Sequence, residues 1–442
     1  MLDAAASISL RLLVALVWLV PAVCAAQAPD PRLTSHIDGI RIVDDHAHVV
    51  APDMTRDRNF DALPCDALPA DGAPTPANVR FGPDLQAAWK ALYGFLGTSD
   101  APDQIKAYES RQAAIRTKMG AGYYNWVLDR AGFDTVLANR IVMGPELSGA
   151  RFRWVPYDDA LLFPLDNSAG KAASPDRKIL FEAEERLLAA SMSARGVSSR
   201  PASLDDYLAR VVTPTLEAQR RDGALGIKFE AAYLRSLEFL PADRSAATKA
   251  YAAGASGAID GMAYRQLQDF LFRYIAAEAG RLGLVVQIHT GSGCGTYFDD
   301  RGSDPLLLDS VLNDPDLRRT RFVLLHGGSP FDRHITTLLL KPNAWVDTSM
   351  IELLFSPPEL ARMMRPWLEV NPERVLFGSD AGPFGPGLGW EETTWLAGRR
   401  ARRALGLALS GMAADGVVTL ARAKEIASGV LRENARSLYG LK

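Results

Sequence analysis

The sequence predicts an α/β fold in which eight parallel strands and the helices between them form one (β/α)8 TIM barrel. Three observations support this prediction: short apolar segments recur along the chain, helical patterns separate them, and polar residues directly follow several of them. The chain has 442 residues, of which 48% are hydrophobic and 23% charged, so it can form a large core. A single barrel with insertions reaches about 400 residues.

Eight segments are continuous apolar runs rather than alternating patterns. Continuous runs are typical of parallel strands that are buried on both faces of a sheet. We expect strands at Ile40–Val43, Thr135–Ala138, Phe152–Pro156, Leu225–Phe229, Leu284–Ile288, Phe322–Leu325, Ala344–Asp347 and Val375–Phe377.

Helical patterns lie between these strands. Ser203 followed by Asp206 resembles a capping box, and apolar residues at helical spacing begin at Leu204. A second periodic segment covers Leu267–Ile275, and Gly283 ends it before the next strand. The order of strand, helix and strand is that of repeated βα units.

We expect a signal peptide at residues 1–26 and one barrel domain at residues 27–442. Two stretches interrupt the order of strands and helices: residues 50–132, which are helical around 104–119, and the Ala- and Gly-rich residues 242–261. Insertions that follow barrel strands lie at the C-terminal rim. We therefore expect residues 50–132 to form a lid.

The first residues have the pattern of a secretory signal peptide. Arg11 precedes the apolar run Leu12–Val20, and small residues follow as far as Ala26. This run is about half of the roughly 20 residues that span a bilayer, so we expect cleavage after Ala26 and no stable membrane span afterwards. A lipoprotein would use Cys24, but residues 21–23 match a lipobox poorly. The prediction is a secreted or periplasmic protein.

Cleavage would leave two cysteines, Cys65 and Cys294, in an oxidising compartment where they could pair. The sequence alone does not say whether their Cα atoms come within bonding distance. Two cysteines are too few for a disulfide-dependent scaffold or a zinc knuckle.

The distribution of charge argues against a nucleic-acid partner. The chain has 49 Lys and Arg against 52 Asp and Glu, a formal net charge of −3, and both signs are spread along it. No basic tract is present that could neutralise phosphates. We expect a small-molecule substrate instead, and a homo-oligomer is compatible with the sequence.

Polar residues that can bind a metal end several of the predicted strands. His46 and His48 are two residues apart, so on a strand they point the same way, and His289, His326 and Asp380 end three later strands. Active sites of such barrels lie at the carboxyl ends of the strands. Imidazole and carboxylate are ligands of zinc and related divalent ions, so the set predicts a metal centre.

Each of these residues alone has a structural explanation. A single histidine at a strand end is more often a hydrogen-bonded structural residue than a ligand, and Asp380 could cap a helix. Only the set favours a metal, because four of the six histidines of the chain end predicted strands. We expect His36 and His334 to be structural.

The chain resembles the amidohydrolase superfamily, and within it the amidohydrolase-related branch that contains decarboxylases, lactonases and domains fused to glutamine synthetases. The resemblance extends from about Arg41 to Leu441, and the insertion after His48 falls outside it. The matching motifs are Asp45-His46-Ala47-His48, Gly226-Ile227-Lys228, Ile288-His289-Thr290-Gly291, Leu325-His326-Gly327-Gly328, Phe377-Gly378-Ser379-Asp380 and Asn434-Ala435-Arg436.

The resemblance implies one or two divalent ions, with zinc as the expected metal. The implied ligands are His46, His48, His289 and Asp380, and His326 either binds a second ion or contacts the substrate. In binuclear members a lysine of strand four is carbamylated and bridges two metals, and Lys228 lies at that position. Alternatively, Lys228 is charged and binds a substrate carboxylate or pairs with Glu230 or Asp380. A protonated lysine is a poor ligand, so it must lose its charge before it can bind metal.

The ligand set implies hydrolysis of an amide C–N bond or an ester or lactone C–O bond. The metal would activate water, Asp380 would act as general base, and His326 would assist in catalysis. The alternative reaction is a metal-dependent non-oxidative decarboxylation at the same site, and a binding protein without chemistry is the non-enzymatic alternative. The residues considered for substrate contact at the rim are Arg41, Tyr233, Arg235, Glu352 and Trp390, each of which could equally well be a packing or surface residue.

Overall fold

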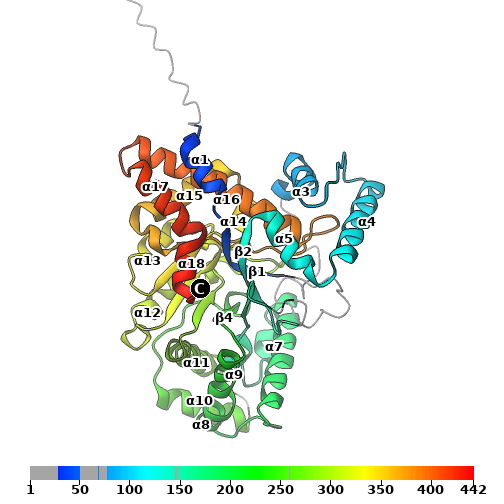
Figure 1. Cartoon of the computed structure of the whole chain (residues 1–442). Coiled ribbons are helices and arrows are strands. Elements are labelled where there is room, and N and C mark those ends of the chain that lie inside the picture. Colours follow the sequence, from blue (N-terminus) through cyan, green and yellow to red (C-terminus); the bar gives the residue numbers. More distant parts are fainter. Residues whose placement is uncertain (1–27, 50–67, 69–76, 145–146, 148, 258) are drawn as a thin grey trace, which may run out of the picture.

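Eight parallel strands form the centre of the fold (Figure 1). The computed structural model describes residues 28–49, 68, 77–144, 147, 149–257 and 259–442. The strands are β1 (Ile42–Ala47), β2 (Phe133–Asn139), β3 (Phe152–Val155), β4 (Gly226–Phe229), β5 (Val285–Ile288), β6 (Arg321–Leu324), β7 (Ala344–Asp347) and β8 (Val375–Leu376). Each overlaps a segment that the sequence predicts as a strand.

Backbone hydrogen bonds close the eight strands into a barrel. Regular parallel ladders join β1 to β3 and β4 to β8 in sequence order. Between β3 and β4, Lys228 N donates to Pro156 O at 2.8 Å. Between β8 and β1, Asp45 N donates to Phe377 O at 3.1 Å and His48 N to Ala381 O at 2.8 Å. The predicted (β/α)8 barrel is confirmed.

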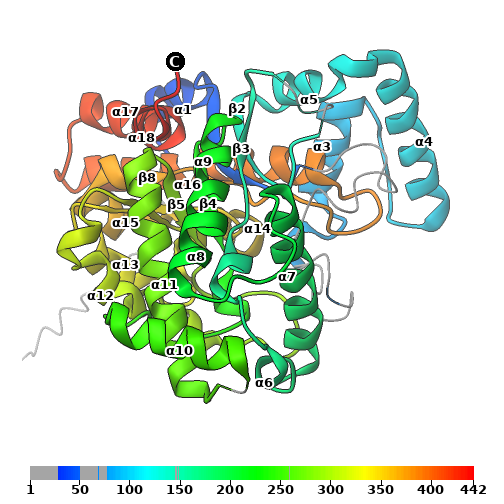
Figure 2. The ribbon, with the colours of Figure 1, turned by 90° about the horizontal axis from the view of Figure 1, so that it is seen from below.

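Helices surround the barrel and occupy its connections (Figures 1 and 2). Ser203 accepts a hydrogen bond from Asp206 N at 3.1 Å, and Gly283 ends α11 with φ of 71°, as the sequence predicts. The helices are α1 (Pro31–Asp38), α3 (Pro83–Tyr93), α4 (Pro102–Met119), α5 (Tyr123–Ala131), α6 (Ser168–Lys171), α7 (Pro175–Ala194), α8 (Leu204–Tyr207), α9 (Thr213–Arg221), α10 (Arg244–Ser256), α11 (Gly261–Leu282), α12 (Asp309–Leu312), α13 (Asp332–Leu338), α14 (Ile351–Leu354), α15 (Pro357–Val370), α16 (Trp390–Ala414), α17 (Leu420–Ser428) and α18 (Asn434–Tyr439). None of the described helices is long and apolar enough to cross a membrane.

The described part of the first insertion is a helical lobe made of α3, α4 and α5, which lies beside the barrel (Figures 1 and 2). It packs against α16, and Trp89 Nε1 donates to Gly387 O at 2.8 Å. The lobe therefore contacts the loop that follows Asp380. Residues 50–67 and 69–76 lie outside the described residues, and the lid stays a prediction. The second interruption, residues 242–261, contains α10.

Apolar side chains of the strands and of α18 fill the inside of the barrel. One buried cluster contains Val43 of β1, Leu137 of β2 and Val285 of β5 together with Leu438 and Tyr439 of α18. The larger cluster contains the outward-facing residues and the helices that cover them. Helix α18 thus packs into the barrel interior.

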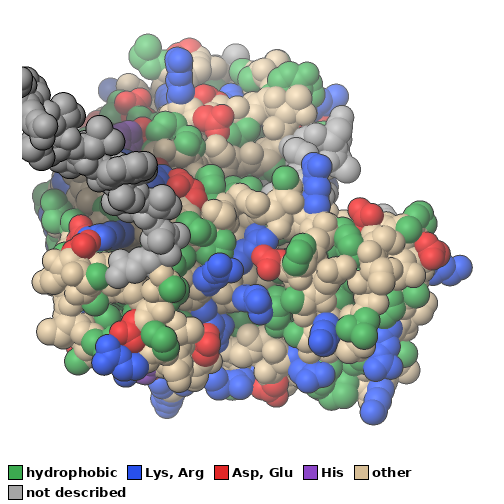
Figure 3. Space-filling view, turned by 90° about the horizontal axis from the view of Figure 1, so that it is seen from above, with side chains coloured by type: hydrophobic (Ala, Val, Ile, Leu, Met, Phe, Trp, Pro, Cys, Tyr) green, Lys and Arg blue, Asp and Glu red, His purple; other side chains and the backbone are tan. Residues whose placement is uncertain are grey.

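The surface carries both signs of charge. On the face in Figure 3, basic side chains lie among acidic and apolar ones. That nucleic acid is not a partner stays a prediction.

Candidate metal centre

Four strands bring predicted ligands together at their carboxyl ends. Asp380, which follows β8, has Oδ1 at 2.9 Å from His46 Nε2 and at 3.0 Å from His48 Nε2. Its Oδ2 is 3.8 Å from His326 Nδ1, which follows β6. His46, His326 and Asp380 each offer one ligand atom, and these three atoms lie within 4.8 Å of one another. This is close enough for one ion to bind all three.

Lys228 lies beside these ligands and is fully buried. Its Nζ is 3.5 Å from His46 Nε2 and 2.8 Å from Glu230 Oε1. Of the two acidic partners that the sequence proposes for a charged Lys228, the structure therefore pairs it with Glu230. The other oxygen of Glu230, Oε2, is 3.6 Å from His289 Nδ1.

His289 provides an observation that fits a metal. Its ring centroid is 4.6 Å from that of His326, and its side chain is almost completely buried. Its Nε2 has no hydrogen-bond partner among the described residues. A buried imidazole nitrogen without a partner costs free energy, and a bond to a metal would satisfy it. The described donor set of imidazoles and one carboxylate suits zinc and related divalent ions.

The protonation states also suit metal binding. Burial lowers the pKa of His46 and of His289 well below the usual value, and burial lowers the pKa of His326 to about 4. These rings are therefore neutral at pH 7, which is the form that binds metal. Burial opposes ionisation of Asp380, whereas positive charge on the adjacent His46 and His326 lowers its pKa. When these rings are neutral, a bound metal cation would supply that charge and keep Asp380 a carboxylate.

The backbone places two of these residues in an uncommon conformation. His326 has φ of 64° and Asp380 has φ of 51°, in the left-handed region that side chains other than glycine rarely adopt. Hydrogen bonds hold both turns, because His326 N donates to Asp347 Oδ1 at 2.7 Å and Asp380 N donates to His46 O at 2.8 Å. Strained residues of this kind cluster at functional sites.

The structure adds partners of the histidines that the sequence does not single out. Tyr157 Oη is 3.1 Å from His48 Nδ1, Ser349 Oγ is 2.9 Å from His326 Nδ1, and Asn139 Oδ1 is 2.6 Å from His46 Nδ1. Asn139 directly follows the predicted strand Thr135–Ala138, so its place at a strand end was a usable signal. Glu230 lies two residues after Lys228, and it too was visible as a polar residue after a strand.

Of the five rim residues, Tyr233 lies at the centre, since its ring centroid is 4.6 Å from that of His289. For Arg41, Arg235 and Trp390 the structure shows contacts of the packing and surface kind, which the sequence offers as the alternative to substrate contact. Arg41 Nη2 is 2.8 Å from Asp129 Oδ1, Arg235 Nη2 is 2.6 Å from Asp269 Oδ1, and Trp390 stacks on Tyr124. Glu352 is completely buried in the protein and is not available at a rim.

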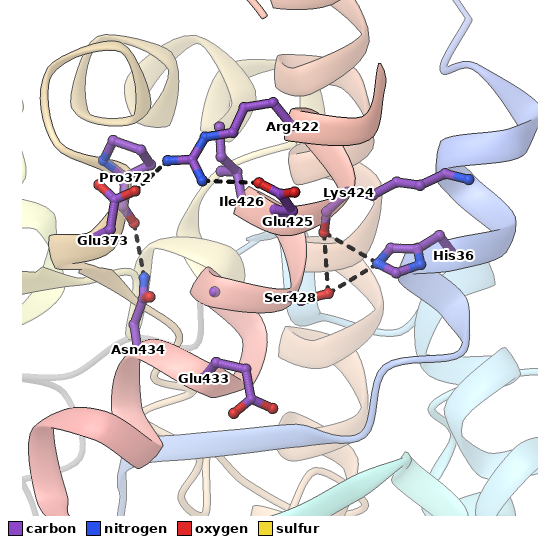
Figure 4. A pocket seen from close by; sticks show the side chains of 11 residues that line it. His36, Pro372, Glu373, Arg422, Lys424, Glu425, Ile426, Ser428, Glu433 and Asn434 are labelled. Atoms are coloured by element: carbon purple, nitrogen blue, oxygen red, sulfur yellow. Dashed lines mark hydrogen bonds and ion pairs between the residues drawn. The ribbon is translucent and has the colours of Figure 1, made fainter. Parts of the chain in front are cut away.

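The two histidines expected to be structural lie elsewhere. His334 Nδ1 is 2.8 Å from Asp304 Oδ1. His36 Nε2 is 3.0 Å from Ser428 Oγ, in a pocket of about 430 Å³ between α1 and α17 (Figure 4). In this pocket Arg422 reaches between Glu373 and Glu425 and forms an ion pair with each.

Cys294 follows β5 in the glycine-rich loop and is disulfide-bonded. Its backbone N–H donates to Tyr233 Oη at 3.3 Å, so this loop contacts the residue whose ring lies next to that of His289. Cys65 lies outside the described residues, and its pairing with Cys294 stays a prediction.

Comparisons with known proteins agree with the geometry. A family model described as amidohydrolase matches residues 165–441, more than half of the chain. The match includes Lys228, His289, His326 and Asp380 and begins after His46 and His48. Protein FluG of Emericella nidulans is 30% identical over 183 residues, which are 40% of this chain and 20% of FluG. The chain therefore matches about a fifth of that relative's length.

Solved structures share the fold. Glucuronate isomerase from Caulobacter crescentus has a TM-score of 0.64 at 15% identity, over 93% of each chain. A protein from Lactobacillus casei, described as a candidate metal-dependent hydrolase, has a TM-score of 0.58 at 18% identity, over 92% of this chain and 97% of its own. Uronate isomerase from Thermotoga maritima has a TM-score of 0.58 at 12% identity, over 93% and 98%.

Proposed function

This chain belongs to the amidohydrolase family, and from that premise we propose that it is a metal-dependent hydrolase of small molecules that cleaves an amide C–N bond or an ester or lactone C–O bond. The observation that carries the proposal is the position of Asp380. One carboxylate oxygen lies between His46 and His48 at 2.9 and 3.0 Å, and the other faces His326. A carboxylate so placed can both bind a metal and accept a proton.

The residues then have separate roles. His46, His48, His289 and Asp380 would hold a divalent ion, which would supply Lewis acidity and a more acidic water. Asp380 accepts the proton of the attacking water and returns it to the leaving group. His326, which Ser349 holds by its Nδ1 at 2.9 Å, contacts the substrate oxygen. Burial of His46, His289 and His326 limits the access of competing water to these side chains.

The contacts of Lys228 favour one ion rather than two. Its Nζ lies 2.8 Å from Glu230 Oε1, and both side chains are buried. Carbamylation needs the neutral amine, and it would leave Glu230 without its cation. Zinc remains the metal that we propose, since its preferred ligands are the described ones.

We also propose that the protein is exported, on the basis of the signal-peptide pattern in residues 1–26, which lie outside the described part of the chain. Protein purified from the periplasm or the medium should begin near Gln27 when its N-terminus is sequenced. An intact Met1 in that material would contradict the proposal. The barrel domain does not depend on this outcome.

The hydrolase proposal is tested by a substrate screen with the purified, zinc-loaded protein. The panel contains N-acyl amino acids, dipeptides, lactones, aromatic carboxylic acids and uronic acids. We expect turnover of an amide, ester or lactone that requires zinc and is lost in Asp380→Asn. Release of CO₂ from an aromatic acid, or isomerisation of a uronate, without any hydrolysis would replace the hydrolase proposal by a lyase or an isomerase.

A further inference from the structure

A chain of hydrogen bonds crosses the inside of the barrel directly beneath the metal centre. Asn139 Nδ2 at the end of β2 donates to Gln287 Oε1 of β5 at 2.9 Å. Gln287 Nε2 donates to Asp45 O of β1 at 2.6 Å and to Tyr439 Oη of α18 at 2.9 Å. Strands β2 and β5 are not neighbours in the barrel, so these bonds span its interior.

The polar side chains in this position require an explanation. The interior of such barrels is usually filled by branched apolar residues, as it is here one layer lower, where Val285 and Leu137 pack. Asn139 and Gln287 are both completely buried. A buried amide costs free energy unless it is hydrogen-bonded. In each hydrogen bond of this series the donor and the acceptor are 2.9 Å apart or closer.

The donors and acceptors in this series of hydrogen bonds can be assigned in only one consistent way. The carbonyl oxygen of Asp45 can only accept, so the group of Gln287 that faces it is the NH₂ group. The oxygen of Gln287 therefore faces Asn139 and accepts from its NH₂ group. The oxygen of Asn139 is then left to face His46 Nδ1 at 2.6 Å. Because that oxygen can only accept, Nδ1 of His46 must carry a proton.

We propose that Asn139 and Gln287 are positioning residues that fix His46 in the Nδ1–H tautomer and so present its unprotonated Nε2 to the metal. This inference rests on the metal centre of the proposed function. His46 Nε2 faces Asp380 Oδ1 at 2.9 Å and Lys228 Nζ at 3.5 Å. A lone pair beside a carboxylate oxygen is repulsive unless a cation lies between them, and the fixed tautomer thus prepares the site for a divalent ion.

The inference also gives α18 a role at the site. Tyr439 accepts from Gln287 and lies 3.4 Å from Asp45 Oδ2. It restrains the amide of Gln287 from below, so that a helix at the far end of the barrel supports a ligand of β1. Its contribution is smaller than that of Asn139, because Asp45 O alone already orients Gln287.

Variants of Asn139 separate positioning from packing. Asn139→Leu keeps the size but has no acceptor, whereas Asn139→Asp keeps an acceptor for His46 Nδ1–H and loses the bond to Gln287. We expect Asn139→Leu to weaken metal binding by about 10- to 100-fold and Asn139→Asp to stay within a few-fold of the parent protein. If Asn139 only packs, the buried charge of the aspartate would make Asn139→Asp the worse variant, and this order would overturn the proposal.

Gln287 and a matched control complete the set. Gln287→Leu releases Asn139 and should weaken metal binding in the same direction. Asn343 is another buried asparagine and directly precedes β7. Its Nδ2 is 3.5 Å from Leu317 O. Asn343→Leu should reduce stability without changing metal affinity. A loss of affinity in Asn343→Leu equal to that in Asn139→Leu would assign both effects to general destabilisation and overturn the proposal.

The tautomer can be measured without metal. In ¹⁵N-histidine-labelled apoprotein, long-range ¹H–¹⁵N correlation spectra distinguish Nδ1–H from Nε2–H, and His46→Gln identifies the signal. We expect Nδ1–H in the parent protein and a mixture or Nε2–H in Asn139→Leu. Nδ1–H in both proteins would overturn the proposal. If instead the parent protein binds no divalent ion while the tautomers follow expectation, the proposed function fails and the role of Asn139 stands.

Discussion

Among single residues, Asp380 should affect turnover most. Asp380→Asn keeps an oxygen that can bind metal, but the amide cannot accept a proton at neutral pH. We expect kcat to fall by about 10²- to 10⁴-fold, with a smaller change in KM, because proton transfer belongs to the transition state. Steady-state kinetics on protein of measured metal content test this expectation. Near-normal turnover in a metal-replete variant would leave Asp380 with a structural role only.

His289 can be tested by metal content alone. Its Nε2 has no described hydrogen-bond partner, so His289→Ala should lose most of the bound ion while the fold is retained, as should His46→Ala. His334→Ala is the matched control, because His334 pairs with Asp304 away from the centre. Full metal content in His289→Ala, measured by elemental analysis after dialysis, would remove His289 from the ligand set.

The proposed ligands could be singled out from the sequence because they end strands, whereas the pairing of each ligand with its partner could not. A parallel barrel brings every strand end to one face, so His46, His289 and Asp380 needed no knowledge of contacts. Asn139 meets His46 across neighbouring strands, and Gln287 meets Asn139 across the interior. Which side chains face one another there depends on the stagger of the closed barrel, which no local pattern encodes. The same reason explains why Arg235, after β4, turns to Asp269 and not to the centre.

Among the elements, the lobe of α3, α4 and α5 is attached to α16 through two buried carboxyl groups. Glu391 Oε1 accepts from Tyr123 Oη at 2.7 Å, and Arg116 of α4 lies 3.1 Å from the same oxygen. Glu392 contacts the hydroxyl of Tyr108 and accepts from Gly389 N at 2.6 Å. Burial raises the pKa of Glu392 to about 8, and the adjacent Glu391 adds to this effect.

The attachment of the lobe should therefore weaken as pH rises. Since the pKa of Glu392 is about 8 in the folded protein and near the ordinary value of 4.5 in the unfolded chain, the folded state holds one more proton between these values. Its contribution to stability is complete below the lower value and is lost as pH rises through about 8, by at most about 1.4 kcal/mol per pH unit.

Glu392→Gln isolates this contribution, because the amide reproduces the protonated carboxyl group: its NH₂ group donates to Tyr108 and its oxygen accepts from Gly389 N. We expect the free energy of unfolding to fall less steeply between pH 6 and 8 in Glu392→Gln than in the parent protein. Hydrogen exchange of α3–α5 over the same range should show the same difference. Parallel pH profiles of the two proteins would show that Glu392 is ionised throughout.

The helices of the lobe are partly predictable. The segment 104–119 has a helical pattern and lies within α4, because local propensity and spacing decide helix formation. Its packing on α16 is not predictable in this way, since the contacts pair Tyr108 and Tyr123 with residues 284 and 268 positions away. Only the closed fold brings these segments together.

For the whole molecule, the disulfide of Cys294 predicts a covalent connection across the chain. Peptide mapping without reductant should recover the peptide of Cys294 linked to that of Cys65, and reduction should separate them. Cys294 N bonds to Tyr233, so reduction should also loosen the loop next to His289. A linkage of Cys294 to any other peptide would contradict the predicted pair.

The split of the proposed metal ligands between the first and the last strand of the barrel has a consequence for biosynthesis. His46 and His48 belong to or follow the first strand, Asp380 follows the last, and Tyr439 supports them from the final helix. A growing polypeptide has no complete site until the residues as far as Asp380 have left the ribosome, so the ion enters only after that point. Added zinc should slow unfolding, because it binds the native state, but leave the refolding rate unchanged. The compartment in which folding finishes then determines which metal the protein acquires.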